Sequence, residues 1–281
     1  MGSKGEIVMA YQAVFKRYEL KYRVTFEQKA RILSAMAPYM VQDEYGKSTV
    51  RNIYYDTDDC VLARHSIAKP DYKEKLRIRS YSKADAESTV FVELKRKYDH
   101  VVYKRRVGLA EKEAMDWISS GRRIGEETQR DKEIDYFLDY YKGLKPALYL
   151  SYDREAYRMK DGMDWADGGS DFRVTFDSNI RCRETELSLE ADPYGKSILD
   201  DGIYLMELKC SGGIPLWLTK VLSEEHIYKT SFSKYGMAYC YFMEKTPMDV
   251  SRMVAEGSIA TSPQTLYMPK HVFANPAMIT A

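Results

Sequence analysis

The sequence predicts an α+β fold built on a closed, eight-stranded antiparallel β-barrel with helices packed on its outside. Short segments such as 75–79 and 91–97 alternate apolar and charged residues, which places an apolar row and a charged row on opposite faces of a strand. Few segments have the continuous apolar character of a parallel sheet. Closing the sheet removes its edges and turns the charged faces toward one another.

The first half of the chain supplies five predicted strands. The first spans 15–24, and Thr25 with Gln28 forms a capping-box pattern that opens a helix to about residue 37. Asp99 and His100 are expected to form a tight turn between the last two strands. Helical periodicity follows over 110–142. The remaining strands of this half are expected over 48–56, 74–81, 89–97 and 100–107.

The second half supplies three more strands, over 147–158, 171–177 and 203–210, with a loop at 161–170. Pro215 begins a helix that reaches about residue 223, and 235–242 forms a last helix. We expect residues 15–246 to be one folded domain, with an N-terminal extension over 1–14 and a flexible tail over 247–281.

Composition limits the classes of function. The 281 residues are 44% apolar, enough for a large core, and 43 basic against 42 acidic residues leave a net charge of +1. Such a charge argues against nucleic acid as a partner, so an anion site requires local concentration of charge. The four cysteines form no CxxC pair, which favours a reduced, cytoplasmic protein. Without an apolar run of about 18 residues, no membrane insertion by this chain is expected.

Cationic side chains recur on one face of the predicted strands. On the first strand, Glu19 and Lys21 lie opposite Tyr18 and Leu20, and taken alone this pattern favours an edge strand with solvated charges. Several cationic faces that converge in one barrel repel one another, so a multiply charged anion is their natural occupant. The pattern recurs at Arg77 and Arg79, Glu93 and Lys95, Lys104 and Arg106, Tyr152 and Arg154, Arg173, and Glu207 and Lys209.

The glutamates among these cations have two interpretations. As ion-pair partners, Glu19 and Glu93 neutralise their neighbours. As hard oxygen ligands, they hold Mg²⁺ or Mn²⁺ against phosphate oxygens. The residue pattern leaves both open.

Seven segments, taken together and in order, resemble the VTC domain, the polyphosphate polymerase branch of the triphosphate tunnel metalloenzymes. Each segment alone is a weak signal, whereas the ordered set covers about residues 15–243 and is similar to stand-alone bacterial members. The segments are RYELKY (17–22), LRIR (76–79), VELK (92–95), YDREAY (152–157), FRVTFD (172–177), MELK (206–209) and FSKY (232–235).

This resemblance implies a tunnel that binds ATP by its triphosphate, with Mn²⁺ or Mg²⁺ held by a strand glutamate, and transfers the terminal phosphoryl group to a growing polyphosphate chain with release of ADP. It implies Glu207 as the metal ligand, and the residue pattern leaves Glu19 and Glu93 as further candidates. The implied catalytic phosphate ligands are Lys21, Arg77, Arg79, Lys95, Arg154, Arg173 and Lys234. The candidate substrate-binding residues are Lys104, Arg106, Tyr152, Lys209, Lys229 and Ser233, of which Arg106 and Lys209 come from the strand pattern.

One position departs from the family pattern. Ser231 stands where eukaryotic members often have a second lysine, and the nearest lysine is Lys229. Two other functions remain open: a tunnel-fold triphosphatase that hydrolyses inorganic or nucleoside triphosphate, and a non-catalytic polyphosphate-binding subunit. Ser233 and Lys234 favour the polymerase. The expected partners are ATP and inorganic polyphosphate or triphosphate, with a membrane protein as a further partner.

Overall fold

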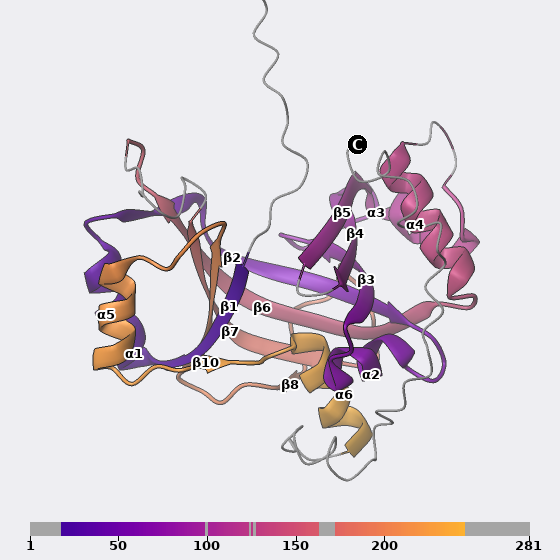
Figure 1. Ribbon diagram of the computed structural model, residues 1–281. Coiled ribbons are helices and arrows are strands. Elements are labelled where there is room, and N and C mark those ends of the chain that lie inside the picture. The colour runs from indigo at the N-terminus through magenta and orange to yellow at the C-terminus, as the bar shows by residue number, and fades with distance from the viewer. Residues whose placement is uncertain (1–17, 99–100, 124, 126–127, 163–171, 245–281) are drawn as a thin grey trace, which may run out of the picture. The chain divides into compact units, whose positions relative to one another are not determined.

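The computed structural model describes residues 18–98, 101–123, 125, 128–162 and 172–244 (Figure 1). Within these ranges the chain forms one ten-stranded antiparallel sheet and six helices. The expected extension over 1–14, the Asp99-His100 turn, most of the loop at 161–170 and the tail over 247–281 lie outside the described residues.

The eight predicted strands are all present, with somewhat different ends. Two strands of two residues each, β8 (Lys196–Ser197) and β10 (Lys229–Thr230), were not expected. The eight longer strands are β1 (Tyr18–Thr25), β2 (Met40–Asp56), β3 (Tyr72–Ser80), β4 (Thr89–Tyr98), β5 (Val101–Ala110), β6 (Lys145–Met159), β7 (Arg173–Arg183) and β9 (Ile203–Cys210).

Five of the six described helices match predicted segments. The capping box of α1 (Phe26–Met36) is confirmed, because the Thr25 side chain accepts from the Gln28 backbone and the Gln28 side chain accepts from the Thr25 backbone. The others are α3 (Glu111–Ser120), α4 (Gln129–Tyr140), α5 (Leu216–Glu224) and α6 (Lys234–Glu244).

The helix α2 (Val61–Ala68) was missed because its capping group is distant in sequence. Its N-terminal neighbour, Cys60, has φ 55° and provides no side-chain cap. Instead, the Asp56 carboxylate accepts from the backbone N–H groups of Leu62 and Ala63, each at 2.9 Å. A capping residue several positions before the helix escapes a search for the usual pattern at the first turn.

The predicted closure of the barrel is wrong in its hydrogen bonding. The strand order is β10-β1-β9-β7-β6-β2-β3-β4-β5, with β8 beside β7, and no ladder among the described strands joins β10 to β5. Side chains of distant strands nevertheless make contact. Lys95 Nζ of β4 lies 2.8 Å from Glu19 Oε2 of β1, although five strands lie between β1 and β4 in the sheet order. Because the extended side chains of Lys95 and Glu19 together span more than the roughly 4.8 Å between paired strands, they keep β1 and β4 too far apart for backbone pairing.

Apolar clusters attach helices to both faces of the sheet (Figure 1). On the outer face, Ile32 of α1 and Leu218 of α5 pack with β1, β7 and β9, whereas Trp117 of α3 and Phe137 of α4 pack with β3 and β4. The prediction that helices cover the outside therefore holds for these four. The last helix, α6, lies on the inner face, which is the face that carries Arg77 and Arg154. Its contacts join Tyr235 and Ala238 to Val50, Tyr54 and Leu150.

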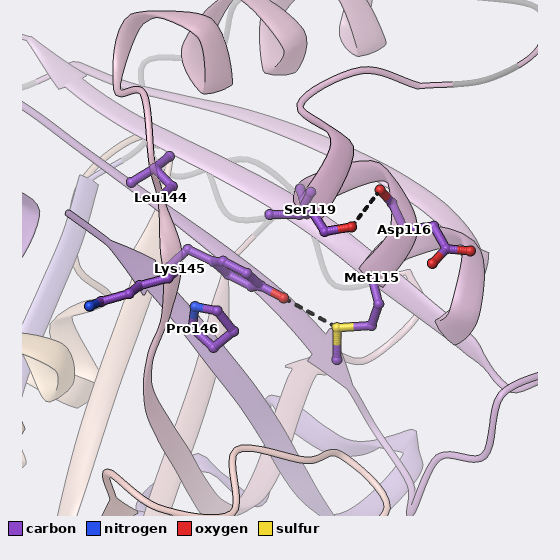
Figure 2. A pocket seen from close by; sticks show the side chains of 8 residues that line it. Met115, Asp116, Ser119, Leu144, Lys145 and Pro146 are labelled. Atoms are coloured by element: carbon purple, nitrogen blue, oxygen red, sulfur yellow. Dashed lines mark hydrogen bonds between the residues drawn. The ribbon is translucent and has the colours of Figure 1, made fainter. Parts of the chain in front are cut away.

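A cavity of about 430 Å³ lies on the outer face, between α3 and the start of β6 (Figure 2). Tyr55, Met115, Leu144 and Pro146 line it, and the Tyr55 hydroxyl donates to Met115 Sδ at 3.2 Å. None of the predicted site residues lines this cavity. Among the described helices, none has the length and apolar character to cross a membrane.

Candidate active site on the inner face

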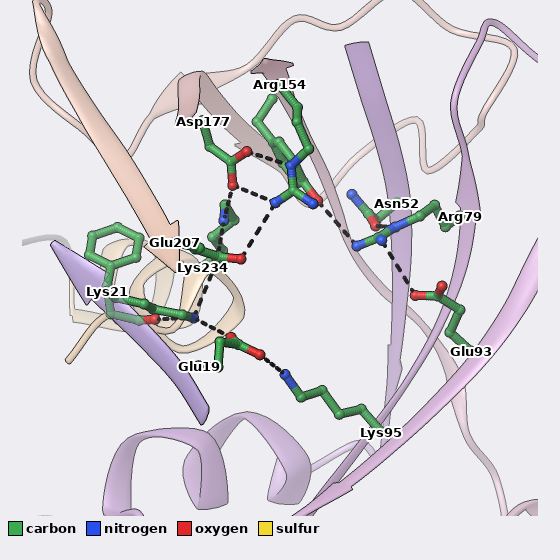
Figure 3. Close-up of polar contacts among 12 residues, drawn as sticks. Glu19, Lys21, Asn52, Arg79, Glu93, Lys95, Arg154, Asp177, Glu207 and Lys234 are labelled. Carbon is green, nitrogen blue, oxygen red and sulfur yellow. Dashed lines mark hydrogen bonds and ion pairs between the residues drawn. The ribbon is translucent and has the colours of Figure 1, made fainter. Parts of the chain in front are cut away.

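Strand pairing gathers the charged residues on the inner face (Figure 3). Lys21 of β1 and Thr175 of β7 flank Glu207 of β9, while Arg77 of β3 lies opposite Glu93 of β4. Cross-strand partners share a face, so their side chains meet. Two groups result, which we call the Glu207 cluster and the Glu93 cluster. The Glu207 cluster contains Glu207, Asp177, Lys21, Arg154 and Lys234, and the Glu93 cluster contains Glu93, Arg77, Arg79, Lys104 and Arg106.

Two buried carboxylates and three cations form the Glu207 cluster. Glu207 Oε1 lies 3.2 Å from Lys234 Nζ and 3.4 Å from Lys21 Nζ, and Glu207 Oε2 lies 3.6 Å from Arg154. Burial raises the pKa of Glu207, but the neighbouring Lys234, Lys21 and Arg154 outweigh it and hold that pKa well below its usual value. Glu207 is therefore ionised across the whole physiological range.

Asp177 fixes two of these cations. It is completely buried and makes a two-pronged contact with Arg154, from Nε to Oδ1 at 2.6 Å and from Nη2 to Oδ2 at 2.7 Å. Its Oδ2 also contacts Lys234 Nζ. Burial raises the pKa of Asp177, and Arg154 with Lys234 reverses the effect and lowers it. The planar fork of an arginine makes this geometry specific.

The start of α6 is anchored so that Lys234 points into the cluster. The Tyr235 hydroxyl donates to Asp56 Oδ2 at 2.6 Å, and its ring stacks on Tyr54 at 4.5 Å. The Ser233 hydroxyl accepts from the Gly236 backbone at 3.2 Å. Ser233, predicted to bind substrate, is thus placed as a cap of the helix that carries Lys234.

Glu93 holds four cations with one carboxylate. It is 1% exposed. Arg77 donates to Oε2 at 2.7 and 2.9 Å, Lys104 and Arg106 contact Oε1 at 2.6 and 2.7 Å, and Arg79 lies 3.6 Å from Oε2. Burial raises the pKa of Glu93, but these cations keep it far below its usual value. Three arginines, together with Lys104, against one carboxylate leave a local excess of positive charge that suits an anion.

Tyr152 joins the two clusters. Its hydroxyl accepts from Arg79 Nη2 at 3.1 Å, while its ring lies 5.0 Å from the Arg154 guanidinium and 4.7 Å from Lys234 Nζ. Arg79 is held further by Asn52, whose Oδ1 accepts from Nε at 3.0 Å. A buried tyrosine in contact with three cations fixes their spacing.

Glu19 of β1 connects β1 with β4 across the inner face. Its Oε2 accepts from Lys95 at 2.8 Å, and its Oε1 lies 3.3 Å from Lys21. Burial raises the pKa of Glu19, and Lys95 and Lys21 together lower it below its usual value despite the nearby Glu207. The predicted site residues Lys21 and Lys95 are thereby brought together from β1 and β4.

Three inner-face lysines have no hydrogen-bond or ion-pair partner in the described part of the chain: Lys73, Lys75 and Lys209. Burial, with the adjacent Lys95 and Lys21, lowers the pKa of Lys75 well below its usual value. Burial likewise lowers the pKa of Lys73 and Lys209 to about 8. Lys73 and Lys75 were not among the predicted site residues, although their spacing continues the row of Arg77 and Arg79.

We expect the affinity for tripolyphosphate to fall between about pH 7 and about pH 9. Burial lowers the pKa of Lys104 to about 7 despite its contact with Glu93, so the free protein loses charge on Lys104, Lys73 and Lys209 in this range. A bound polyanion favours the charged lysines, so binding takes up protons. Titration calorimetry in buffers of different ionisation enthalpy measures that uptake.

The stability of the free protein should show the opposite trend over the same pH range. Lysines in the unfolded chain have pKa values near 10.4, so the unfolded state binds more protons and the free energy of unfolding rises with pH. Chemical denaturation at three pH values measures this. A constant affinity for tripolyphosphate from pH 7 to about pH 9 would contradict the proton linkage.

Two predicted residues lie apart from the clusters. Arg173 pairs with Lys209 on the inner face, but its side chain is 49% exposed and lies 3.4 Å from Asp43. Lys229 of β10 pairs with Tyr22, whose side chain belongs to the outer cluster, so Lys229 lies on the opposite face from Lys21 and is exposed. The structure therefore brings Arg173 to the end of the site and does not bring Lys229 to it.

The carboxylates fit a divalent metal ion only together with ligand oxygens. Glu207 shares Lys21 with Glu19 and Lys234 with Asp177, so carboxylates lie close in pairs. No group of three or more His, Cys, Asp or Glu residues suited to a metal occurs in the described ranges. Mg²⁺ and similar ions are commonly held by one or two carboxylates and completed by phosphate oxygens and water. The donor set fits that arrangement.

An antiparallel sheet with a buried, cation-rich inner face and paired carboxylates defines a class of protein whose charge distribution suits a polyanion. The chain belongs to the VTC domain family, whose model matches residues 16–243. No curated protein matches it significantly.

Similar solved structures include a presumptive adenylate cyclase from Bacillus halodurans, 18% identical over 78% of this chain and 94% of that one, with a TM-score of 0.44. Another from Vibrio parahaemolyticus is 12% identical over 79% of this chain and 96% of that one, with a TM-score of 0.39. At these scores, neither likeness carries an argument about this chain.

Proposed function

We propose that this protein is a metal-dependent polyphosphate polymerase, which transfers the terminal phosphoryl group of ATP to a growing inorganic polyphosphate chain and releases ADP. Membership of the VTC family supports a function on polyphosphate or triphosphate. The observation that carries the proposal is the row formed by Lys73 and Lys75, for which the described residues supply no ion-pair partner, beside the cation-rich Glu93 cluster. A row of this length suits a long polyanion in addition to one nucleotide.

The residues supply positioning and charge rather than a nucleophile. In the proposed reaction, a terminal oxygen of the polyphosphate chain attacks the γ-phosphorus of ATP. A new P–O bond forms, the bond to the bridging oxygen breaks, and its electron pair leaves with ADP. The attacking oxygen is already deprotonated at neutral pH, so no strong general base is needed. Arginines and lysines around the phosphates lower the barrier by spreading the negative charge.

In this proposal the Glu93 cluster and the Glu207 cluster contact different parts of the substrates. Arg77, Arg79 and Lys104 bind the triphosphate of the donor, while Lys21, Arg154 and Lys234 surround the transferring group. A divalent ion, Mn²⁺ or Mg²⁺, would be held by Glu207, with Glu19 as a second carboxylate, and supplies charge neutralisation on phosphate oxygens when bound.

Two alternatives keep the same site. If water replaces the end of the polyphosphate chain as the phosphoryl acceptor, the protein is a triphosphatase that hydrolyses inorganic or nucleoside triphosphate. If the site binds polyphosphate without turnover, the protein is a non-catalytic polyphosphate-binding subunit. The lysine row favours the polymerase, because a single triphosphate does not need it. A cytoplasmic location and a membrane-protein partner are further parts of the proposal.

The deciding experiment is incubation of the protein with ATP and Mn²⁺ or Mg²⁺, followed by gel electrophoresis of the products. We expect long polyphosphate together with ADP, in an amount that matches the phosphate incorporated. Free phosphate without polymer would show the triphosphatase instead. Polyphosphate binding without any release of ADP, over a full range of metals and primers, would show the non-catalytic subunit.

A further inference from the structure

The inner-face side chains of β3 change from lysine at one end of the strand, through arginine, to tyrosine just beyond the other end. Lys73 and Lys75 occupy one end, Arg77 and Arg79 follow, and Tyr81 continues the spacing beyond the strand. The Tyr81 hydroxyl accepts from Arg79 at 3.5 Å and also from Arg106. Tyr81 therefore lies directly beside the phosphate-binding arginines, and its side chain is 40% exposed.

Phe91 and Arg106 extend this aromatic end across the neighbouring strands. Phe91 pairs with Arg79 on one side and with Gly108 on the other. A Cβ on Gly108 would lie 3.3 Å from the Phe91 ring, so glycine at this position leaves room for the ring. The Arg106 guanidinium lies 4.3 Å from the Phe91 centroid and 5.5 Å from that of Tyr81. The two rings meet edge to face at 5.8 Å.

We propose that Tyr81, Phe91 and Arg106 form a binding site for the base of the nucleotide donor. ATP then lies along β3 with its base at Tyr81 and its γ-phosphate directed toward Lys75, and the acceptor chain approaches from Lys73. This inference rests on the proposed function, because it requires ATP as the donor.

The chemistry of this end suits a nucleobase and not a phosphate chain. Aromatic rings and guanidinium planes stack on bases, and such stacking tolerates different bases because each has a π-face. Inorganic polyphosphate has no flat apolar surface, so it gains nothing from Tyr81 and Phe91. Conversely, at the other end of the row β3 contributes Lys73 and Lys75 to the inner face, which present charge and no aromatic ring of their own.

The test compares ATP with tripolyphosphate as ligands of the wild type, Tyr81→Ala and Tyr81→Phe, by titration calorimetry. Tyr81→Ala should weaken ATP binding roughly tenfold, in the range of a lost base–aromatic stack, and leave tripolyphosphate binding within about twofold. Tyr81→Phe retains the ring and should bind ATP like the wild type. Tyr228→Ala, at a tyrosine 77% exposed beside β10, is the matched control and should change neither affinity.

The outcomes separate this inference from the proposed function. Unchanged ATP binding in Tyr81→Ala, or an equal loss for ATP and tripolyphosphate, overturns the base site, since an equal loss means that Tyr81 acts only through Arg79 and Arg106. Retained tripolyphosphate binding also shows that the variant is folded. A selective loss for ATP in a protein that makes no polymer would support the base site and overturn the polymerase alone.

Discussion

Replacing Glu207 with glutamine should lower metal-dependent phosphoryl transfer on the order of 100-fold or more, the scale of a lost charged group in a preorganised site. Glutamine keeps the shape of the side chain and removes its charge, and with it the carboxylate that the metal needs. Because Lys21, Lys234 and Arg154 all contact Glu207, the same change makes the inner face more positive. Tripolyphosphate binding without metal should therefore be retained or tightened.

Initial rates of ADP release against Mn²⁺ concentration measure the first effect, and calorimetry with tripolyphosphate in a chelator measures the second. Glu155→Gln is a matched control, because Glu155 is on β6 and pairs with Lys29 at 2.7 Å, away from the cluster. Glu207→Asp should recover part of the activity at higher metal concentration. Wild-type turnover in Glu207→Gln would remove this residue from the proposed metal site.

Alternation along the strands predicted which residues share the inner face, because it fixes the face on which a residue lies. It placed Arg77, Arg79 and Arg154 on one surface, and the structure shows them there. It could not say which cation meets which carboxylate, since that depends on the strand order and on the curl of the sheet. The contact of Lys95 with Glu19 joins strands that are distant in both sequence and sheet order.

The role of Asp177, the openness of the sheet and the face of Lys229 could not be predicted from the sequence. Asp177 ends a recognised segment, but an acidic residue at the end of a strand is also common in turns. Open and closed sheets have the same alternation, so closure was not predictable from it. The face of Lys229 depends on β10, a strand of only two residues whose pairing with β1 has no periodic signal.

Replacing Asp177 with asparagine should lower the free energy of unfolding by about 3–5 kcal/mol, the cost of breaking a buried ion pair from one side. Asp177 is fully buried and is the closest carboxylate to Arg154, at 2.6 and 2.7 Å. Asparagine fits the same space but leaves Arg154 and Lys234 with Glu207 alone. These two largely buried cations then repel each other at short range, where screening by water is weak.

Urea denaturation measures the loss, and repeating it with tripolyphosphate tests its cause. A bound polyanion pairs with Arg154 and Lys234, so it should stabilise Asp177→Asn more than it stabilises the wild type. Asp153→Asn is the matched control: Asp153 is on β6, is 20% exposed and contacts Thr49 and Asn179, so its loss should cost less than about 1 kcal/mol. If Asp177→Asn were as stable as this control, Arg154 and Lys234 would not depend on Asp177, and the cluster would be held together by Glu207.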